Sequence, residues 1–412
     1  MSRPSADVIV IGAGVVGAAC AQAAARAGLS VVVVDRGPLA GGTTGAGEGN
    51  LLVSDKAPGP ELDLARYSLE RWARLDETLS QVGGPVTPSG AAVTPGAAHP
   101  PQPGPSSGGG FELERKGGLI VASGPRSLAV VTELAAAQRA AGLRVDDVPA
   151  DRLRDLEPHL APDLAGGAHY PQDAQLQPML ATARLLADAR RHGARVLTGV
   201  EVTAFLGRGV TGVRTARGDL HAGAVVNAAG PWAGAVAVLA GVHLPVLPRR
   251  GVVLVTQPLP PLIRHKVYAA EYVADVASDQ AGLESSAVVE GTPSGTVLVG
   301  ASRERVGFDP GLPVPVLRRL AAQALRLFPV LGEARLLRAY RGYRPYCPDH
   351  LPVIGADPRV PGLVHACGHE GAGVGLAAGT GSLVAQVLTG TVPDLDLTPF
   401  RPDRFDRSGV AA

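Results

Sequence analysis

Hydrophobic residues near the start of the chain fall in two continuous runs that predict buried strands. Residues 7–12 read DVIVIG and residues 30–35 read SVVVVD, with an alanine-rich helical segment ending at Gly28 between them. Strands that are apolar along their whole length and joined by a helix are typical of a parallel sheet covered on both faces. The chain therefore opens with a strand, a helix and a second strand.

Two further patterns follow. Helical periodicity predicts helices at residues 125–143, 177–193 and 373–390, and residues 194–205 read as a pair of strands. The middle of the chain instead carries short β-rich runs with polar turns between them, which predict a largely antiparallel sheet. These runs cover residues 251–257, 265–276, 286–291 and 296–302.

The predicted fold class is α/β, or α+β overall, with a Rossmann-like nucleotide-binding domain interleaved with an antiparallel-sheet domain. We expect the nucleotide domain to comprise residues 1–60, 145–235 and 335–412, and the second, substrate-binding domain to comprise residues 61–144 and 236–334. Residues 85–110 are nearly all Pro, Gly, Ala, Ser and Thr. Such a segment buries too little apolar surface to offset its ordering entropy, so we predict a flexible insertion there.

Composition excludes several classes of function. The 412 residues are 46% apolar, and 38 Lys and Arg nearly balance 37 Asp and Glu. This predicts a soluble protein of more than one domain, without the basic surface of a nucleic-acid binder. The three cysteines are far apart in sequence, which favours the cytoplasm over a disulfide framework or a structural zinc site. The apolar N-terminal run is broken by glycines, so we predict neither a signal peptide nor a membrane segment.

The turn after the first strand has the spacing of a dinucleotide site. Gly12, Gly14 and Gly17 form a G-x-G-x-x-G motif that opens the helix, and Asp35 ends the next strand. In this motif the glycines allow a tight turn, close approach of the backbone to a pyrophosphate and helix–strand packing, and the acid accepts a ribose hydroxyl. The alternative is a turn that serves packing alone, which this context makes the weaker interpretation.

Two more glycine-rich segments bear on which dinucleotide binds. Residues 41–50 read GGTTGAGEGN, and residues 368–381 read GHEGAGVGLAAGTG just before the last predicted helix. Each lets backbone approach a large flat ligand, and the second adds a helix N-terminus suited to the electron-rich edge of a flavin. Two flexible surface loops are the alternative.

Arg344 lies in the segment RGYRPYCPDHLPVIG (341–355), whose prolines predict a stiff loop rather than a helix. A guanidinium there can bind a carboxylate with two parallel hydrogen bonds. From the residues alone, an ion pair with Asp349 in the same segment is a slightly better explanation.

In this order, DVIVIGAGVVG, YPQDAQLQP (170–178), VVNAAGPWA (225–233), RGYRPYCPDHLPVIG and GHEGAGVGLA resemble the FAD-dependent amine and amino-acid oxidoreductases of the glycine oxidase, sarcosine oxidase and D-amino-acid dehydrogenase superfamily. GTTGAGEGN, RPYCPDHLP and GHEGAG are most similar to the flavin subunits of opine oxidase and D-hydroxyproline dehydrogenase, and to the related cyanide synthase subunit. The resemblance covers nearly the whole chain except the insertion.

The resemblance implies FAD and a set of residues that contact it. Contacts with the adenosine, the phosphates and the flavin fall on Gly12, Gly14, Gly17, Asp35, Arg36, Thr43, Thr44, Gly45, Val202, Ala228, Gly230, Trp232, Gly368, His369, Gly371, Gly373 and Val374. Gly342 stands where several relatives tether the flavin through a cysteine, so we expect non-covalent FAD. Gly371 replaces a long side chain of some amino-acid oxidases, which weakens any transfer of their substrate preference.

The reaction implied is oxidation of the C–N bond of an amino or imino acid, of the D-hydroxyproline, D-amino-acid or opine type, by hydride transfer to flavin N5. Arg344 matches the position that holds the substrate carboxylate. Glu48 and His350 are candidates for contacting the amine, and Tyr346 and Tyr272 for lining the pocket; each is equally well explained as a loop or packing residue.

Two other interpretations stay open at this point. The subgroup resemblance implies a flavin subunit that works only within an electron-transfer complex containing iron–sulfur and second flavin subunits. The chain has too few cysteines to ligate a cluster itself. An NAD-dependent dehydrogenase shares the glycine motif but does not account for residues 368–381.

Overall fold

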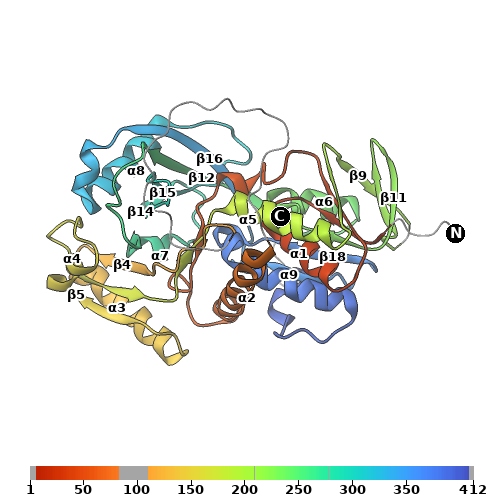
Figure 1. The fold of residues 1–412 in the computed structure, drawn as a ribbon, viewed down its shortest axis with the longest axis horizontal. Helices are drawn as coiled ribbons and strands as arrows, with labels where there is room; N and C mark the ends of the chain where they lie inside the picture. Colours follow the sequence, from red (N-terminus) through yellow and green to blue (C-terminus); the bar gives the residue numbers. More distant parts are fainter. Residues whose placement is uncertain (1–5, 83–109, 208, 277, 408–412) are drawn as a thin grey trace.

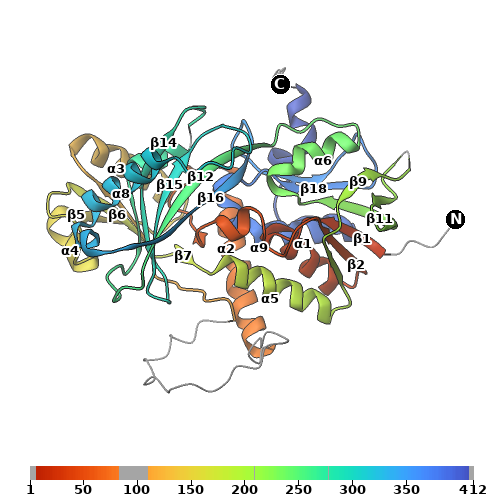
Figure 2. The same ribbon diagram turned by 90° about the horizontal axis from the view of Figure 1, so that it is seen from above.

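The computed structural model describes residues 6–82, 110–207, 209–276 and 278–407. The predicted insertion therefore lies outside the described residues, apart from residue 110. Two eight-stranded sheets lie side by side along the long axis of the molecule (Figures 1 and 2).

The first sheet is the predicted parallel one. Its strand order is β17-β18-β11-β1-β2-β8, every pair from β18 to β8 is parallel, and β10 and β9 extend it through β11. The strands are β1 (Ala6–Ile11), β2 (Val31–Asp35), β8 (Arg195–Thr198), β9 (Val202–Phe205), β10 (Gly212–Thr215), β11 (Gly218–Asn227), β17 (Val353–Ala356) and β18 (Leu363–Cys367).

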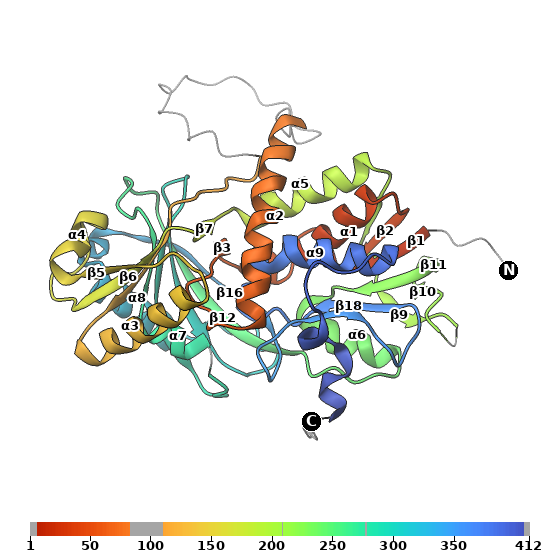
Figure 3. The same cartoon turned by 90° about the horizontal axis from the view of Figure 1, so that it is seen from below.

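Both faces of this sheet are covered, which explains the uninterrupted apolar run of β1. Val8 and Val10 face the core beneath the long helices, whereas Ile9 and Ile11 face the core on the other side. The first face carries α1 (Val15–Arg26), α2 (Pro60–Val82), α5 (Pro178–Arg191) and α9 (Gly373–Thr389), and the second carries α6 (Ala233–Leu239) (Figure 3).

Helix α9 packs unusually closely on α1. A Cβ atom added at Gly381 would come within 2.6 Å of the Ala19 backbone, so only glycine permits this approach. Residues 370–389 are long and apolar enough to cross a membrane by length and composition, but 61% of that stretch is buried within the protein. Core helices of folded proteins pass the same test, so this feature is weak evidence for a membrane span.

The second sheet has the order β16-β12-β15-β14-β13-β4-β6-β5, and every pair except β13–β4 is antiparallel. Its strands are β4 (Gly118–Ala122), β5 (Asp146–Pro149), β6 (Gly166–Tyr170), β12 (Leu247–Thr256), β13 (Lys266–Ala269), β14 (Glu284–Gly291), β15 (Val297–Arg303) and β16 (Leu336–Tyr346). Around it lie α3 (Pro125–Ala140), α4 (Leu153–Leu156), α7 (Glu271–Val276) and α8 (Val314–Leu327), and β3 (Asn50–Leu51) pairs with β7 (Ala174–Gln175) nearby. The 3-10 turns are η1 (Thr43–Ala46), η2 (Ala150–Arg152), η3 (Gly230–Trp232), η4 (Pro329–Glu333), η5 (Glu370–Ala372), η6 (Thr398–Phe400) and η7 (Pro402–Arg407).

Three predicted elements were wrong in detail. Residues 265–276 are not all strand, because helix α7 follows β13. The two strands in 194–205 do not pair with each other, since β8 joins β2 and β9 joins β10. Arg344 lies in strand β16 rather than in a loop. β16 is the edge strand of its sheet, where a proline such as Pro345 is tolerated because its missing amide has no further neighbour to bond.

The two sheets also do not divide at the predicted domain boundaries. β5, β6 and β16 belong to the second sheet, although they fall in ranges predicted for the nucleotide domain. Helix α2, predicted for the other domain, packs on α9 of the first. The local patterns of these segments are correct, but sheet membership depends on pairing with strands far away in sequence.

Candidate active site

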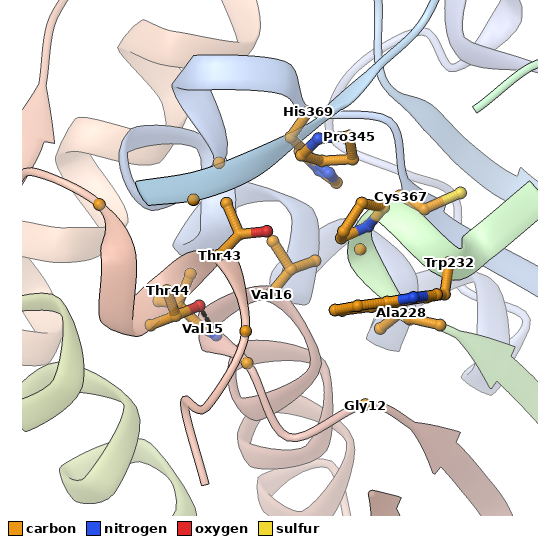
Figure 4. A pocket seen from close by; sticks show the side chains of 18 of the residues that line it. Gly12, Val15, Val16, Thr43, Thr44, Ala228, Trp232, Pro345, Cys367 and His369 are labelled. Atoms are coloured by element: carbon orange, nitrogen blue, oxygen red, sulfur yellow. Dashed lines mark hydrogen bonds between the residues drawn. The ribbon is translucent and has the colours of Figure 1, made fainter. Parts of the chain in front are cut away.

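A cavity of about 350 Å³ lies where the two sheets meet. Its walls come from the β1–α1 turn, the ends of β2, β11 and β18, turn η1, and strands β12 and β16. Figure 4 shows labelled residues from the β1–α1 turn, η1, the ends of β11 and β18, and β16 around one space. Of the residues predicted to contact cofactor, the lining includes Gly12, Gly14, Asp35, Arg36, Thr43, Thr44, Val202, Ala228, Gly230, Trp232, His369, Gly371, Gly373 and Val374.

Three predicted residues do not line the cavity and have packing roles instead. A Cβ at Gly17 would lie 2.0 Å from the Gly12 carbonyl oxygen, so Gly17 lets helix α1 approach the turn. Gly45 faces the Ala40 carbonyl in the same way at 2.5 Å, and Gly368 has φ +75°.

The first turn is shaped for close approach of a ligand to backbone. Gly12 has φ +110°, and a Cβ there would lie 2.3 Å from the Ala228 carbonyl oxygen. Asp35 accepts hydrogen bonds from the amides of Ala13 and Gly37, each at 2.7 Å, so its carboxylate is fixed at the cavity wall. The predicted ribose acceptor is thus held in place by the backbone of the turn.

Two helix N-termini face the cavity. Val15 begins α1, and its amide donates to Thr44 Oγ1 at 3.0 Å (Figure 4). Gly373 and Val374 begin α9 at another part of the wall. Helix N-termini carry partial positive charge and unpaired amides, which suit phosphates and the electron-rich edge of a ring.

An aromatic stack closes one side of the cavity. The guanidinium of Arg36 lies 4.4 Å from the centre of the Trp232 ring. Trp232 also stacks on Phe308, with ring centres 5.1 Å apart and planes only 4° from parallel. Phe308 lies in the loop that follows β15, a strand of the second sheet. Nothing in the sequence around Phe308 predicted that it would stack on Trp232.

Arg344 places a guanidinium at the wall of the cavity. It lines the cavity, and its Nη1 donates to the Ser302 carbonyl oxygen at 2.8 Å. Within the described residues no carboxylate lies within ion-pair distance of it. Desolvation, with the neighbouring charge of Arg303, lowers the pKa of Arg344 to about 10. The alternative pairing with Asp349 was wrong, because that carboxylate binds Arg404 at 2.6 Å.

The other predicted catalytic residues separate into two groups. Glu48 and Tyr272 line the cavity. Tyr346 and His350 do not: the Tyr346 hydroxyl donates to Asp279 at 2.8 Å, and His350 binds Asp279 and Glu370. Their geometry gives both a role in holding neighbouring segments rather than contact with a ligand.

Sequence reasoning missed Glu370, which lines the cavity beside His350. Its carboxylate receives hydrogen bonds from Arg249 Nη1 at 2.7 Å and His350 Nδ1 at 3.0 Å. Burial opposes ionisation, but these two donors lower the pKa of Glu370, and the bond to Glu370 raises the pKa of His350. Arg249 lies in strand β12, 101 residues before His350 and 121 before Glu370, so the sequence carries no local signal for this group.

The described residues offer neither a metal site nor a reactive thiol that would tether a flavin. Among the described residues, no group of three or more His, Cys, Asp or Glu side chains could hold a metal ion. Cys367 lines the cavity, but burial raises its thiol pKa to about 12, which disfavours the thiolate. Non-covalent attachment of a cofactor stays a prediction.

These features fit FAD. Glycine backbone at Gly12 and Gly14 admits a pyrophosphate, two helix N-termini supply positive potential, and the cavity runs from Val202 to the start of α9. The fold and the cavity together define a dinucleotide-binding protein.

Comparison with known proteins makes the class specific. Residues 7–387 match the family model described as DAO, FAD dependent oxidoreductase, so the chain belongs to this family. The resemblance to the superfamily of FAD-dependent amine and amino-acid oxidoreductases is confirmed, and so is FAD as cofactor.

Individual relatives cover the chain to different extents. It is 28% identical to hydrogen cyanide synthase subunit HcnC of Pseudomonas aeruginosa over 433 aligned positions, covering 98% of this chain and 97% of that protein. It is 33% identical to the glycine oxidase of Pseudomonas putida over 206 positions, covering 49% of this chain and 52% of that one. The crystal structure of glycine oxidase from Geobacillus kaustophilus superposes with a TM-score of 0.84 at 25% identity, covering 98% and 99% of the two chains.

Proposed function

We propose that this chain oxidises the C–N bond of an amino or imino acid, of the D-hydroxyproline, D-amino-acid or opine type, with FAD as hydride acceptor. The family supplies the oxidoreductase chemistry, and the relatives named as glycine oxidases support an amino-acid-like substrate. The sequence resemblance to D-hydroxyproline dehydrogenase and opine oxidase flavin subunits supports the narrower classes.

One observation carries this proposal: Arg344 presents a guanidinium to the cavity without an acidic partner among the described residues. Charged side chains are rarely left unpaired in a desolvated site unless a ligand completes them. A substrate carboxylate does so with two parallel hydrogen bonds, which fix its orientation as well as its position.

When bound, FAD accepts a hydride at its N5 atom. The chain's own contribution is geometry. Arg344 holds the carboxylate, Ser302 fixes the guanidinium through its carbonyl, and Tyr272 forms part of the wall that keeps water from the substrate. Holding the substrate Cα in one orientation turns the reaction into an effectively intramolecular step.

The experiment uses the FAD-loaded protein without oxygen. A panel of D-amino acids, cis- and trans-hydroxyproline isomers, N-methyl amino acids and opines is added, and loss of the oxidised flavin absorbance identifies the substrate. Arg344→Lys should weaken substrate binding far more than FAD binding, and Arg338→Lys, on the exposed part of the same strand, should change neither. Unchanged spectra across the panel, or equal loss of substrate and FAD in Arg344→Lys, would reject the proposal.

A second candidate function is a flavin subunit that transfers electrons inside a complex. The relative HcnC is named as a subunit of hydrogen cyanide synthase and aligns over 97% of its length. The three cysteines of this chain are buried and unpaired, so a cluster would have to come from another protein. Copurification with an iron–sulfur protein would favour this candidate, whereas rapid peroxide formation by the isolated chain would favour an oxidase that acts alone.

A further inference from the structure

Glu48 is the second charged residue of the cavity whose bonding is incomplete. Its side chain is 6% exposed and lines the cavity. Oε2 accepts a hydrogen bond from Asn50 Nδ2 at 3.2 Å, whereas Oε1 is shielded from water and has no partner among the described residues. A buried carboxylate oxygen without a donor is costly, so this geometry calls for a donor from a ligand.

The cations around Glu48 lie closer to other carboxylates than to Glu48. Lys266 is the nearest cation, but its Nζ lies 2.5 Å from Glu290 and 3.8 Å from Glu48, so it pairs with Glu290. Lys116 is paired with Glu114 at 3.5 Å. Three carboxylates thus face two ammonium groups, and Glu48 has the longest of the three ion-pair distances.

The position of Glu48 is built into the backbone. A Cβ at Gly300 would lie 2.4 Å from Glu48 Oε1. The carboxylate therefore occupies space that a side chain at position 300 would need. The terminal torsion of a glutamate is soft, so the carboxylate can turn about it when a ligand binds. The charge of Glu48 also acts on Arg344: it opposes the lowering of the Arg344 pKa by burial and Arg303.

From this arrangement we infer that Glu48 binds the amine of the substrate and makes the site selective for an amine over an alcohol of the same shape. The inference rests on the proposed function, in which Arg344 binds the carboxylate. Together the two residues give the cavity a cationic and an anionic wall, which complement a zwitterionic amino acid. An alcohol or a hydroxy acid offers no cation, so it leaves the Glu48 carboxylate desolvated and unneutralised.

His350, the other candidate for the amine, is excluded by its place outside the cavity. Both of its ring nitrogens are already bonded, to Glu370 and Asp279. Glu370 lines the cavity, but Arg249 neutralises it. Of Glu48 and Glu370, Glu48 is therefore the one with a buried carboxylate oxygen that has no donor in the described part of the chain.

The test uses the FAD-loaded protein without oxygen and two ligand pairs that differ at the nitrogen: glycine with glycolate, and D-proline with (R)-tetrahydrofuran-2-carboxylate. Binding is followed by the shift of the flavin spectrum, or by the concentration dependence of bleaching where the ligand reacts. Wild-type protein should prefer the amine member of at least one pair. In Glu48→Gln, the affinity for the amine member should fall by about tenfold or more, and the affinity for the oxygen member by less than about threefold.

Matched variants separate the possible causes. Glu114→Gln removes one negative charge from the same cluster outside the cavity and should leave the preference intact. Glu48→Asp keeps the negative charge but moves the carboxylate away from the ligand, because the side chain is shorter. This variant should lose part of the preference for the amine. Arg344→Lys should weaken both members of a pair; if it weakens neither while Glu48→Gln still lowers the preference, the carboxylate assignment fails and the amine assignment stands.

Other results overturn the inference. Equal weakening of both members by Glu48→Gln, or loss of FAD instead of ligand, would give Glu48 a structural or cofactor-binding role. The absence of any amine preference in the wild-type protein, including failure to bind either pair, would also reject it.

Discussion

The guanidinium of Arg344 occupies the space that a side chain on Gly251 would need. A Cβ at Gly251 would lie 2.1 Å from Nη1, whereas a Cβ at Gly371, on another side of the same side chain, would lie 3.5 Å from Nε. The two glycines therefore differ in consequence: the first is required for the position of Arg344, and the second leaves ordinary contact distance.

Gly251→Ala should displace Arg344 without disturbing the cofactor. The flexible arginine can move, so we expect the protein to fold and to retain FAD, with carboxylate affinity about tenfold weaker through loss of the paired hydrogen bonds. Gly371→Ala is the matched control and should keep Arg344 in place. The measurement is titration with a carboxylate ligand followed by flavin absorbance; similar affinities in the two variants would contradict the prediction.

Gly12→Ala should prevent FAD binding. Gly12 and Gly28 both have positive φ, but a Cβ at Gly12 meets the Ala228 carbonyl oxygen at 2.3 Å, and nothing lies within 4 Å of a Cβ at Gly28. Gly28→Ala therefore suffers only the conformational cost, about 1 kcal/mol, and should bind FAD normally. The bound flavin per chain after purification gives the comparison, and stoichiometric FAD in Gly12→Ala would show that the turn tolerates a side chain.

Phe308→Ala should loosen FAD. Phe308 stacks on Trp232 at the cavity wall although it is itself 42% exposed. Aromatic pairs contribute about 0.5–1.5 kcal/mol beyond their buried area, so the FAD dissociation constant should rise by about 2- to 12-fold. Leu312→Ala, exposed in the same loop, is the control. The recovery of FAD fluorescence on dilution measures FAD dissociation. Equal dissociation from the two variants would show that the Phe308–Trp232 stack does not help to retain FAD.

His369 should make stability fall on acidification. Burial lowers its pKa from 6.5 to about 3, and Nε2 is 3.0 Å from Thr380 Oγ1. At a pH between about 3, the pKa of His369 in the folded protein, and 6.5, its ordinary value in the unfolded chain, the imidazole binds a proton only in the unfolded chain. The free energy of unfolding therefore decreases as pH falls below 6.5, by up to about 1.4 kcal/mol per pH unit, and the loss levels off below about pH 3.

His369→Gln keeps a polar group near Thr380 but cannot titrate, so its unfolding free energy should depend less on pH between pH 6.5 and 5. Denaturant unfolding at several pH values measures the slope. His243→Gln, at an exposed histidine, should retain the wild-type slope. A slope in His369→Gln as steep as in the wild type would assign the acid sensitivity to other groups.

Much of the nucleotide site was determined locally and could be predicted. The apolar runs of β1 and β2, the glycine spacing from Gly12 to Gly17 and Asp35 at the end of a strand each encode their own geometry within about 30 residues of chain. A parallel strand–helix–strand unit positions these residues by itself, whatever the rest of the protein does.

Sheet membership and the substrate end were decided by tertiary structure. The prolines around Arg344 predict a loop. The same residues nevertheless form an edge strand, because strand β12 pairs with them. The contact of Glu48 with Gly300 and that of Trp232 with Phe308 join segments that are far apart in sequence, so no local pattern marks them.

The sequence alone thus determined the cofactor turn and the kinds of charged residue available, because those depend on backbone conformation and side-chain chemistry that act over short stretches of chain. Only the tertiary structure decided which charged groups keep bonding capacity at the cavity. Asp349, His350 and Glu370 found partners elsewhere in the fold, whereas Arg344 and Glu48 were left incomplete at the cavity, and that difference arises from packing between distant segments.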